Sequence, residues 1–251
     1  MVRGFYIAAT GMMVQRRNME IVTHNITNAD TIGYKKEIMG IHSFDSELVR
    51  RLNDYGVPVR STGTGPLNFG AQVDFNFVDF STGGFEETGR ATDLAIAGDA
   101  FFAVETPQGT RYTKCGAFYL NGDGYLTDGD GNFLLGENGR VFVGGGDFAV
   151  GEDGSVTVNG AVVNKIRAVS FADNIALRQQ GDNLYFAGAQ PLAEPKEFAI
   201  LQGFVENSNV DVGREMVDMI TVYRTYETNQ RMLTMIDETV GKAVTEIGRL
   251  R

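Results

Sequence analysis

The chain has 251 residues, of which 43% are hydrophobic, and its 22 Lys and Arg side chains against 32 Asp and Glu side chains give a formal net charge of −10. At roughly 150 residues per domain, this length allows one or two compact units with a sizeable core. The acidic balance argues against a dedicated nucleic-acid binder or a protein held on anionic lipid, because both need a basic surface. Cys115 is the single cysteine, so no disulfide can form within the chain.

Charge, glycine and methionine are unevenly distributed along the chain. Residues 1–37 carry five basic and three acidic side chains and residues 206–251 carry six and eight, so the two ends together are neutral and the whole −10 lies between them. Of the 32 glycines, 24 lie between residues 56 and 188, whereas no methionine lies between residues 40 and 215. This partition predicts two helical ends around a glycine-rich middle.

A first helix is predicted from about residue 3 to residue 28. Its apolar side chains recur at alternating spacings of three and four residues, with one polar interruption at Gln15, which is typical of a heptad stripe. The small polar residues that follow end in Gly33 and favour a turn. The longest apolar stretch here, residues 4–14, is too short to span a membrane, so we expect neither a cleaved signal peptide nor membrane insertion. The stripe consists of Phe5, Ala8, Met12, Met19, Val22 and Ile26.

Short apolar runs alternate with turn sequences in the middle of the chain. Residues 93–97 and 100–104 are typical of strands. Seven Asn-Gly or Asp-Gly pairs lie between residues 121 and 160, and such pairs tolerate the positive φ angles of hairpin loops. The pattern predicts an all-β domain over residues 90–205, preceded by an extended linker over residues 38–89.

A second, longer helix is predicted over about residues 212–250, where only Asn229 interrupts the heptad stripe. Such a helix would be about 58 Å long at 1.5 Å per residue. Packing of the two helices within one chain would satisfy their amphipathicity. The length favours a coiled-coil contact between chains, because it exceeds what a compact domain needs. The stripe consists of Val212, Met219, Val222, Tyr226, Leu233, Ile236, Val240, Ala243 and Ile247.

The sequence contains only weak matches to motifs of catalytic, cofactor-binding or metal-binding sites. Residues 128–132 begin like a calcium loop, but the sixth and twelfth positions are Phe133 and Gly139 rather than glycine and glutamate, so hairpin turns are favoured. The only histidines are His24 and His42, which excludes a His-rich metal site. We therefore predict no catalytic, cofactor or metal site, and no cofactor.

Four separated stretches follow one another along the chain: residues 25–36, 93–102, 109–118 and 203–212, the last followed by residues 215–220 and 224–227. In this order they resemble the signature sequences of flagellar axial proteins, most closely the bacterial flagellar basal-body rod protein family. This sequence departs from the family pattern at Ala100, Lys114 and Cys115. The matching residues include Asn25, Asn28, Gly33, Tyr34, Lys35, Asp93, Phe101, Phe102, Tyr112, Gly116, Ser208, Asn209 and Val210.

The resemblance implies an α+β protein in which residues 1–37 and 206–251 form a helical coiled-coil domain and residues 90–205 a β-rich outer domain. It implies a non-enzymatic structural subunit of the basal-body rod, exported by the flagellar type III apparatus, which self-associates into a helical tube that transmits motor torque to the hook. The implied partners are other rod and hook proteins and the periplasmic and outer rings, with no nucleic acid.

Within the family, residues 63–65 leading to Gly70 resemble the distal rod protein, and the proximal rod protein is the alternative. Two other readings of the residues stay open. A secreted β-sandwich adhesin or carbohydrate-binding module would need exposed aromatic sites and dispensable ends, and a β-rich hydrolase would need an essential acidic residue.

Overall fold

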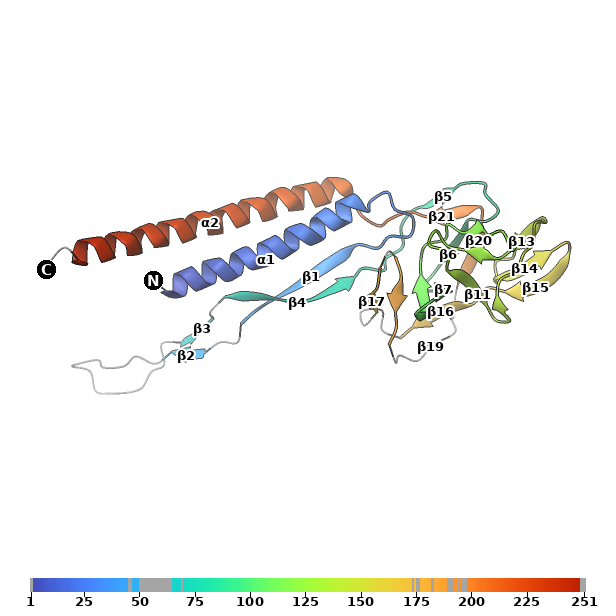
Figure 1. Ribbon diagram of the computed structural model, residues 1–251, viewed down its shortest axis with the longest axis horizontal. Coiled ribbons are helices and arrows are strands. Elements are labelled where there is room, and N and C mark those ends of the chain that lie inside the picture. Colours follow the sequence, from blue (N-terminus) through green and yellow to red (C-terminus); the bar gives the residue numbers. More distant parts are fainter. Residues whose placement is uncertain are drawn as a thin grey trace. The chain divides into compact units, whose positions relative to one another are not determined.

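The computed structural model divides the chain into two compact units, which we term the helical unit and the β unit. The helical unit comprises Met1–His24, Ile38–Asn76 and Gly213–Arg251, and the β unit comprises Asn25–Glu37 and Phe77–Val212. A helix at each end and strands between them make an α+β protein (Figure 1), as the composition predicts. The structure describes residues 2–44, 47–49, 65–68, 70–172, 174, 177–181, 183–188, 192–193, 195 and 198–248; residues 63 and 64 of the predicted distal-rod stretch lie outside them.

The two predicted helices are present as α1 (Val2–Thr27) and α2 (Val212–Gly248). Within the helical unit they run side by side and antiparallel (Figure 1). A Cβ atom at Gly4 would lie 3.3 Å from Cδ1 of Ile236, and one at Gly11 would lie 2.9 Å from Nδ2 of Asn229. Seven residues toward the C-terminus of α1 therefore correspond to seven residues toward the N-terminus of α2.

The glycines of α1 explain how a polar residue fits into the stripe of α2. Asn229 is the one residue that interrupts that stripe, and its amide lies against Gly11, which has no side chain. A larger residue at position 11 would occupy the space of the amide group. The polar interruption and the glycine are thus complementary features of one helix pair.

A β ribbon completes the helical unit. β1 (Glu37–Ser43) pairs with β4 (Ala71–Val78), and β2 (Glu47–Val49) pairs antiparallel with β3 (Gly65–Leu67). The ribbon lies against α1, because a Cβ atom at Gly70 would overlap Oγ1 of Thr10. The rings of Tyr6 and Phe44 also lie 6.5 Å apart. The described residues of the predicted linker region thus include paired strands.

The β unit contains short strands joined by tight turns. Its largest sheet has the strand order β17-β18-β8-β7-β11-β10-β9, with β12, β16 and β19 attached; β13-β14-β15 form a second sheet, and β20-β6 and β21-β5 are pairs. The bounds are β5 Phe85–Glu87, β6 Leu94–Ala97, β7 Phe101–Thr106, β8 Gly109–Thr113, β9 Tyr119–Leu120, β10 Leu126–Thr127, β11 Phe133–Gly136, β12 Gly139–Arg140, β13 Phe148–Val150, β14 Ser155–Val158, β15 Ala161–Lys165, β16 Ala168–Phe171, β17 Arg178–Gln179, β18 Tyr185–Phe186, β19 Leu192–Ala193, β20 Ala199–Gln202 and β21 Phe204–Glu206.

Strand β7 separates two hydrophobic clusters. Phe102 and Val104 belong to the larger cluster, whereas Phe101 and Ala103 belong to the smaller one. All four are fully buried, because successive side chains of a strand point to opposite faces and both faces of β7 are covered. Burial on both sides explains why the sequence of β7 is a continuous apolar run rather than an alternating one.

The residues that begin like a calcium loop form a hairpin turn. β10 pairs antiparallel with β11 through Thr127 and Phe133. The Asp128 carboxylate accepts hydrogen bonds from the backbone N–H groups of Asp130 (3.0 Å) and Asn132 (2.8 Å) and from Nδ2 of Asn132 (2.8 Å). The acidic side chain therefore stabilises the turn itself.

Replacement of Gly116 by alanine should destabilise the β unit. The added Cβ would lie 1.6 Å from the carbonyl oxygen of Leu94, so the backbone of two neighbouring segments must move apart. We expect the free energy of unfolding of the full chain to fall by about 2 kcal/mol or more, measured by urea denaturation. Gly122→Ala is the matched control, because a Cβ there has nothing within 4 Å. Equal stabilities of the two variants would contradict the packing described.

Candidate functional site

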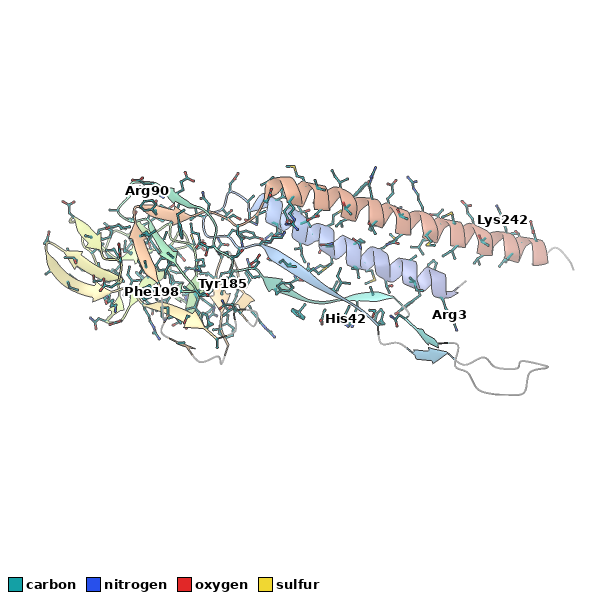
Figure 2. All side chains as sticks on the ribbon, turned by 180° about the vertical axis from the view of Figure 1, so that it is seen from behind. Arg3, His42, Arg90, Tyr185, Phe198 and Lys242 are labelled. Carbon is teal, nitrogen blue, oxygen red and sulfur yellow. The ribbon has the colours of Figure 1, made fainter. Side chains whose placement is uncertain are left out.

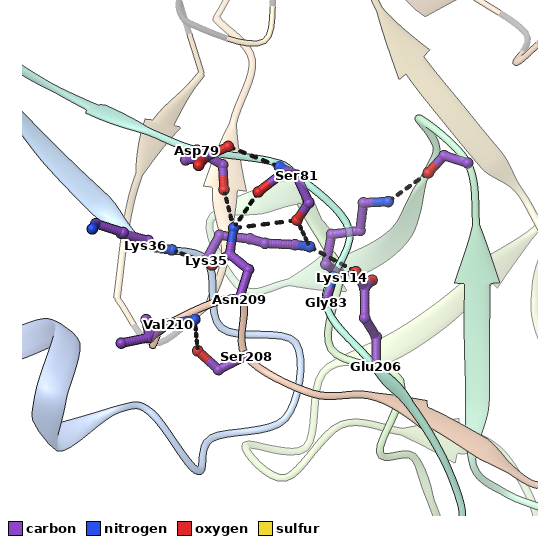
Figure 3. Close-up of polar contacts among 11 residues, drawn as sticks. Lys35, Lys36, Asp79, Ser81, Gly83, Lys114, Glu206, Ser208, Asn209 and Val210 are labelled. Carbon is purple, nitrogen blue, oxygen red and sulfur yellow. Dashed lines mark hydrogen bonds and ion pairs between the residues drawn. The ribbon is translucent and has the colours of Figure 1, made fainter. Parts of the chain in front are cut away.

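A cluster of polar residues in the β unit joins the segment that follows α1 to the segment that precedes α2 (Figure 3). It includes three segments far apart in sequence, near residues 25–37, 79–83 and 206–210, and one lysine from the loop after β8. We term this cluster the polar junction. Its members are Asn25, Gly33, Tyr34, Lys35, Lys36, Asp79, Ser81, Gly83, Lys114, Glu206 and Asn209.

A buried ion pair lies at the centre of the polar junction. Nζ of Lys35 lies 2.7 Å from Oε1 of Glu206, and both side chains are inaccessible to solvent. Nζ of Lys35 also donates to the carbonyl oxygen of Ser81 (2.7 Å), and Oε1 of Glu206 accepts from the backbone N–H of Gly83 (2.9 Å). These additional hydrogen bonds offset part of the desolvation cost of the two charges.

Lys114 brings a second ammonium group near the same carboxylate. Its Nζ donates to the carbonyl oxygen of Gly98 (2.7 Å), and the residue is 2% exposed. Burial lowers the pKa of Lys114 to about 8 from its ordinary value of 10.5, while Glu206 opposes this shift and Lys35 adds to it. The carboxylate of Glu206 therefore interacts with two cations from separate segments.

Two asparagine side chains connect backbone segments around the ion pair. The amide of Asn209 donates to the carbonyl oxygen of Asp79 (2.8 Å) and accepts from the backbone N–H of Lys36 (2.8 Å). The amide of Asn25 donates to the carbonyl oxygen of Glu37 (2.9 Å), accepts from its N–H (2.9 Å) and accepts from the Tyr34 hydroxyl (3.0 Å). Each amide thus serves as donor and acceptor at once.

Gly33 fits a position that other residues cannot take. Its φ of +70° lies in the left-handed region, and a Cβ atom there would lie 2.5 Å from backbone atoms of Cys115. The backbone N–H of Gly33 donates to the carbonyl oxygen of Glu206 (2.7 Å). Cys115 itself is half-buried, and burial raises the pKa of its thiol, which disfavours a reactive thiolate.

Other residues of the four signature stretches lie in the β unit. Gly116 contacts β6 as described above, and the buried carboxylate of Asp93 accepts from Thr88 Oγ1 (2.6 Å) and from Nε of Arg90 (2.8 Å). Phe101, Phe102 and Tyr112 belong to the hydrophobic clusters. Two hydrogen bonds between residues close in sequence lie next to the helices: Asn28 Oδ1 accepts from Thr31 Oγ1 (3.3 Å), and Ser208 Oγ accepts from the N–H of Val210 (3.2 Å).

The predicted heptad stripes lie mostly on covered or half-covered sides of α1 and α2. Ala8, Val22 and Val222 are buried, whereas Phe5 and Val240 are exposed. The side chain of Ile247 lies outside the described residues. The remaining stripe residues, all half-buried, are Met12, Met19, Ile26, Val212, Met219, Tyr226, Leu233, Ile236 and Ala243.

Both helices carry further large apolar side chains that face solvent, which the heptad analysis did not single out. On α1 the most exposed is Met13, at 63%, and on α2 the two most exposed are Val217 at 62% and Val244 at 67%. Such an accumulation on a pair of helices is typical of a surface that a partner covers. The other members of this set are Tyr6, Ile7, Met216, Ile220, Tyr223, Met232 and Met235.

The described part of the chain holds no group of three or more His, Cys, Asp or Glu residues suited to a metal ion. Over the same residues, neither helix combines the length and the apolar character needed to cross a membrane.

Comparison with known proteins matches three separate parts of the chain to family models. Residues 5–35 match the family model described as flagella basal body rod protein, residues 95–181 match the flagellar hook protein FlgE/F/G D1 domain, and residues 201–246 match the flagellar basal body rod FlgEFG protein C-terminal model. The chain is 31% identical to the flagellar basal-body rod protein FlgG of Bacillus subtilis over 97% of this chain and 98% of that protein.

The chain belongs to the flagellar basal-body rod protein family. It is 30% identical to the flagellar basal-body rod protein FlgF of Caulobacter vibrioides and 30% identical to the flagellar hook-basal body complex protein FlhO of Bacillus subtilis, in both cases over the full length of both chains. It is a structural subunit of the flagellar basal body and assembles with other axial proteins of the flagellum.

The signature residues of this rod protein thus come together in two places. Asn25, Gly33, Tyr34, Lys35 and Asn209 meet in the polar junction, and the others stabilise the β unit. The sequence analysis missed three partners of Lys35 and Asn209, namely Glu206, Ser81 and Asp79. Glu206 could have been suspected, because it lies within the fourth stretch and is a possible partner for the lysine of the first.

Replacement of Lys35 by methionine should destabilise the rod protein strongly. Glu206 would then be a buried carboxylate without the ammonium group that contacts it directly, and breaking such a pair costs about 3–5 kcal/mol in free energy of unfolding. Lys165→Met is the matched control, since Lys165 and Glu137 form a longer pair, at 3.7 Å, in which both side chains are well exposed. Urea denaturation should show a change below about 1 kcal/mol for the control. A similar small change for Lys35→Met would contradict the role given to the pair.

Lys114 predicts a pH dependence of stability. Below pH 8 the side chain is charged in both states, so burial of its charge destabilises the fold; between pH 8 and 10.5 the folded state has lost the proton and the unfolded state keeps it. Stability contributed by this residue therefore rises with pH over that window. The free energy of unfolding of the wild type relative to Lys114→Met should rise by on the order of 2–3 kcal/mol across it. A difference that is constant with pH would refute the assignment.

Proposed function

We propose that this rod protein polymerises through α1 and α2 into a helical tube that transmits motor torque to the hook. The observation that supports this most directly is the large set of exposed apolar side chains on the helical unit, including Met13 (63%), Val217 (62%) and Val244 (67%). Neighbouring subunits would remove these side chains from water, at about 25 cal/mol per Å² of apolar surface.

The composition of the helices suits repeated contacts among neighbours that are not equivalent. Contacts between two different surfaces generate a helical assembly when the rotation does not close. Methionine side chains adapt to irregular gaps, and Met13, Met216, Met232 and Met235 are all exposed. We propose that α1 and α2 form a coiled coil at the tube core.

We propose that the distribution of charge along the chain indicates which segments lie inside the tube and which lie outside. Residues 1–37 and 206–251 would form the core, residues 38–89 a linker, and residues 90–205 an outer domain. All of the −10 lies between the neutral ends, so the acidic region would face water while the neutral ends are buried among neighbours. We place the protein in the distal rod, on the resemblance of residues 63–70, with the proximal rod as the alternative.

The proposed partners are further copies of this chain, other rod and hook proteins, and the periplasmic and outer rings. The protein would reach the rod through the type III export apparatus in an unfolded state and fold as it assembles. Its role would be mechanical and would require neither catalysis nor a cofactor, in keeping with the structural role of its family.

Interruption of α2 by proline should abolish assembly. Leu233 lies in mid-helix and is half-buried, and a proline there removes a backbone hydrogen bond and costs about 3 kcal/mol or more. We expect Leu233→Pro to prevent swimming and incorporation into purified basal bodies, whereas Leu233→Met, which conserves volume and helix, should be incorporated. Circular dichroism of the purified variants separates loss of helix from loss of the β unit. Normal swimming of the proline variant would refute assembly through α2.

A further inference from the structure

One face of the largest sheet in the β unit is covered near β7 and exposed near β10. Successive residues of a strand point to opposite faces, and paired residues share a face. Leu126 and Leu134 belong to the larger hydrophobic cluster, so Tyr125 and Phe133 point to the other face. Leu135, on the same side as Phe133, packs against the smaller cluster. Among the described residues, that cluster has no member on β9, β10 or β12.

Four aromatic rings lie on this second face. Tyr119 and Phe133 are each paired with Thr127 of β10. Tyr125, two residues before Thr127, is paired with Phe142, so all four rings share one face. The ring of Tyr125 lies 5.8 Å from that of Phe133 and 5.2 Å from that of Phe142. Tyr119 is 49% and Phe142 is 45% exposed. We term Tyr119, Tyr125, Phe133 and Phe142 the aromatic platform.

The ring of Phe142 rests on the backbone of two glycine turns. A Cβ atom at Gly124 would lie 3.0 Å from Cε2 of Phe142, and one at Gly144 would lie 3.7 Å from its Cζ. These contacts hold the ring in place while almost half of its surface stays accessible. A ring that is already fixed loses little conformational freedom when a ligand packs on it.

Two arginines lie over rings of the aromatic platform. Cζ of Arg140 lies 4.0 Å from the centre of the Phe133 ring, and Cζ of Arg90 lies 5.9 Å from the centre of the Tyr119 ring. Each guanidinium group also pairs with a carboxylate, at 2.7 and 2.8 Å. The side chain of Arg90 is half exposed and stands at the surface of the β unit in Figure 2. Both arginines therefore bring N–H donors to the platform, and their charges are already paired.

Two exposed carboxylates flank the strand at the centre of the platform. Asp123 lies in the turn before β10 and Asp130 in the turn after it. Within the described part of the chain, neither carboxylate has a hydrogen bond or an ion pair. A Cβ atom at Gly122 or Gly129, in the same two turns, would meet nothing within 4 Å. The platform thus has open turns with hydrogen-bond acceptors at both ends of β10.

We propose that the aromatic platform binds a neutral glycan, an extended chain of β-linked pyranose sugars, through its exposed rings. The C–H side of such a sugar is weakly positive and packs on the negative face of an aromatic ring. Its hydroxyl groups both donate and accept hydrogen bonds, which matches a site with arginine donors and aspartate acceptors. This inference goes beyond the proposed function and does not depend on it.

The charges around the platform argue against other ligands that aromatic faces accept. A cationic ligand would meet the guanidinium groups that already lie over Phe133 and Tyr119. An anionic ligand, nucleic acid included, would meet the carboxylates of Asp123 and Asp130. A proline-rich peptide offers few donors, because proline has no backbone N–H, and it would leave these carboxylates without partners. A neutral ligand with many hydroxyl groups meets none of these objections.

Titration calorimetry of the purified full chain with cellotetraose or chitotetraose tests the proposal. We expect saturable binding with a dissociation constant of about 1 mM or lower. Phe142→Ala and Tyr119→Ala should each weaken binding at least about fivefold, because each removes an exposed ring. Tyr119→Phe, which keeps the ring, should bind within about twofold of the wild type. Both positions are about half exposed, so the variants should keep the circular dichroism spectrum of the wild type.

Phe186→Ala is the matched control. Phe186 is 42% exposed, and Cζ of Arg111 lies 4.7 Å from the centre of its ring, but β18 lies toward the opposite end of the strand order from β9. This variant should bind the glycans within about twofold of the wild type. Equal weakening by Phe186→Ala, or binding of a basic or a proline-rich peptide in place of the glycans, would overturn the proposal. Absence of saturable binding of both glycans up to about 10 mM would also overturn it.

Discussion

The buried pair of Lys35 and Glu206 connects the segment that enters the β unit to the segment that leaves it. The two residues are 171 positions apart in sequence, and their side chains meet at 2.7 Å without access to solvent. Such a pair contributes modest stability in itself, because desolvation of both charges offsets most of their attraction. It does specify one arrangement, since any other pairing would leave a buried charge alone. Gly33, Ser81 and Gly83 are held in place by hydrogen bonds to the same two residues.

This arrangement concerns the attachment of both helices in a rod subunit. The end of α1 and the first residue of α2 belong to the β unit, so both helices leave from segments that the polar junction holds together. The amide of Asn209 adds contacts to Asp79 and Lys36 in the same place. These buried polar contacts therefore connect the segment that follows α1 to the segment that precedes α2. The helices themselves carry exposed apolar side chains, which we propose other subunits cover.

Much of this architecture could be predicted from the sequence, because it depends on local patterns. The heptad spacing predicts α1 and α2 to within a few residues, and Asn-Gly and Asp-Gly pairs predict the turns. The long-range contacts could not be predicted in this way. Nothing in the neighbourhood of Asn229 shows that Gly11 faces it, and no local pattern pairs Lys35 with Glu206. The stripe positions were also visible, but whether a stripe residue such as Val222 is covered within the chain or between chains depends on the register of the two helices.

The polar junction is complete within one chain, whereas we propose that assembly covers the exposed apolar surfaces of the helices. Hydrogen exchange of the full chain, free and in purified basal bodies, tests this separation most directly. In the free chain, the amides of Gly33, Lys36 and Gly83, which donate within the polar junction, should exchange as slowly as those of β7. The amides of residues 240–248 should exchange rapidly in the free chain and become protected in the rod. Rapid exchange at the junction, or full protection of residues 240–248 before assembly, would contradict the account.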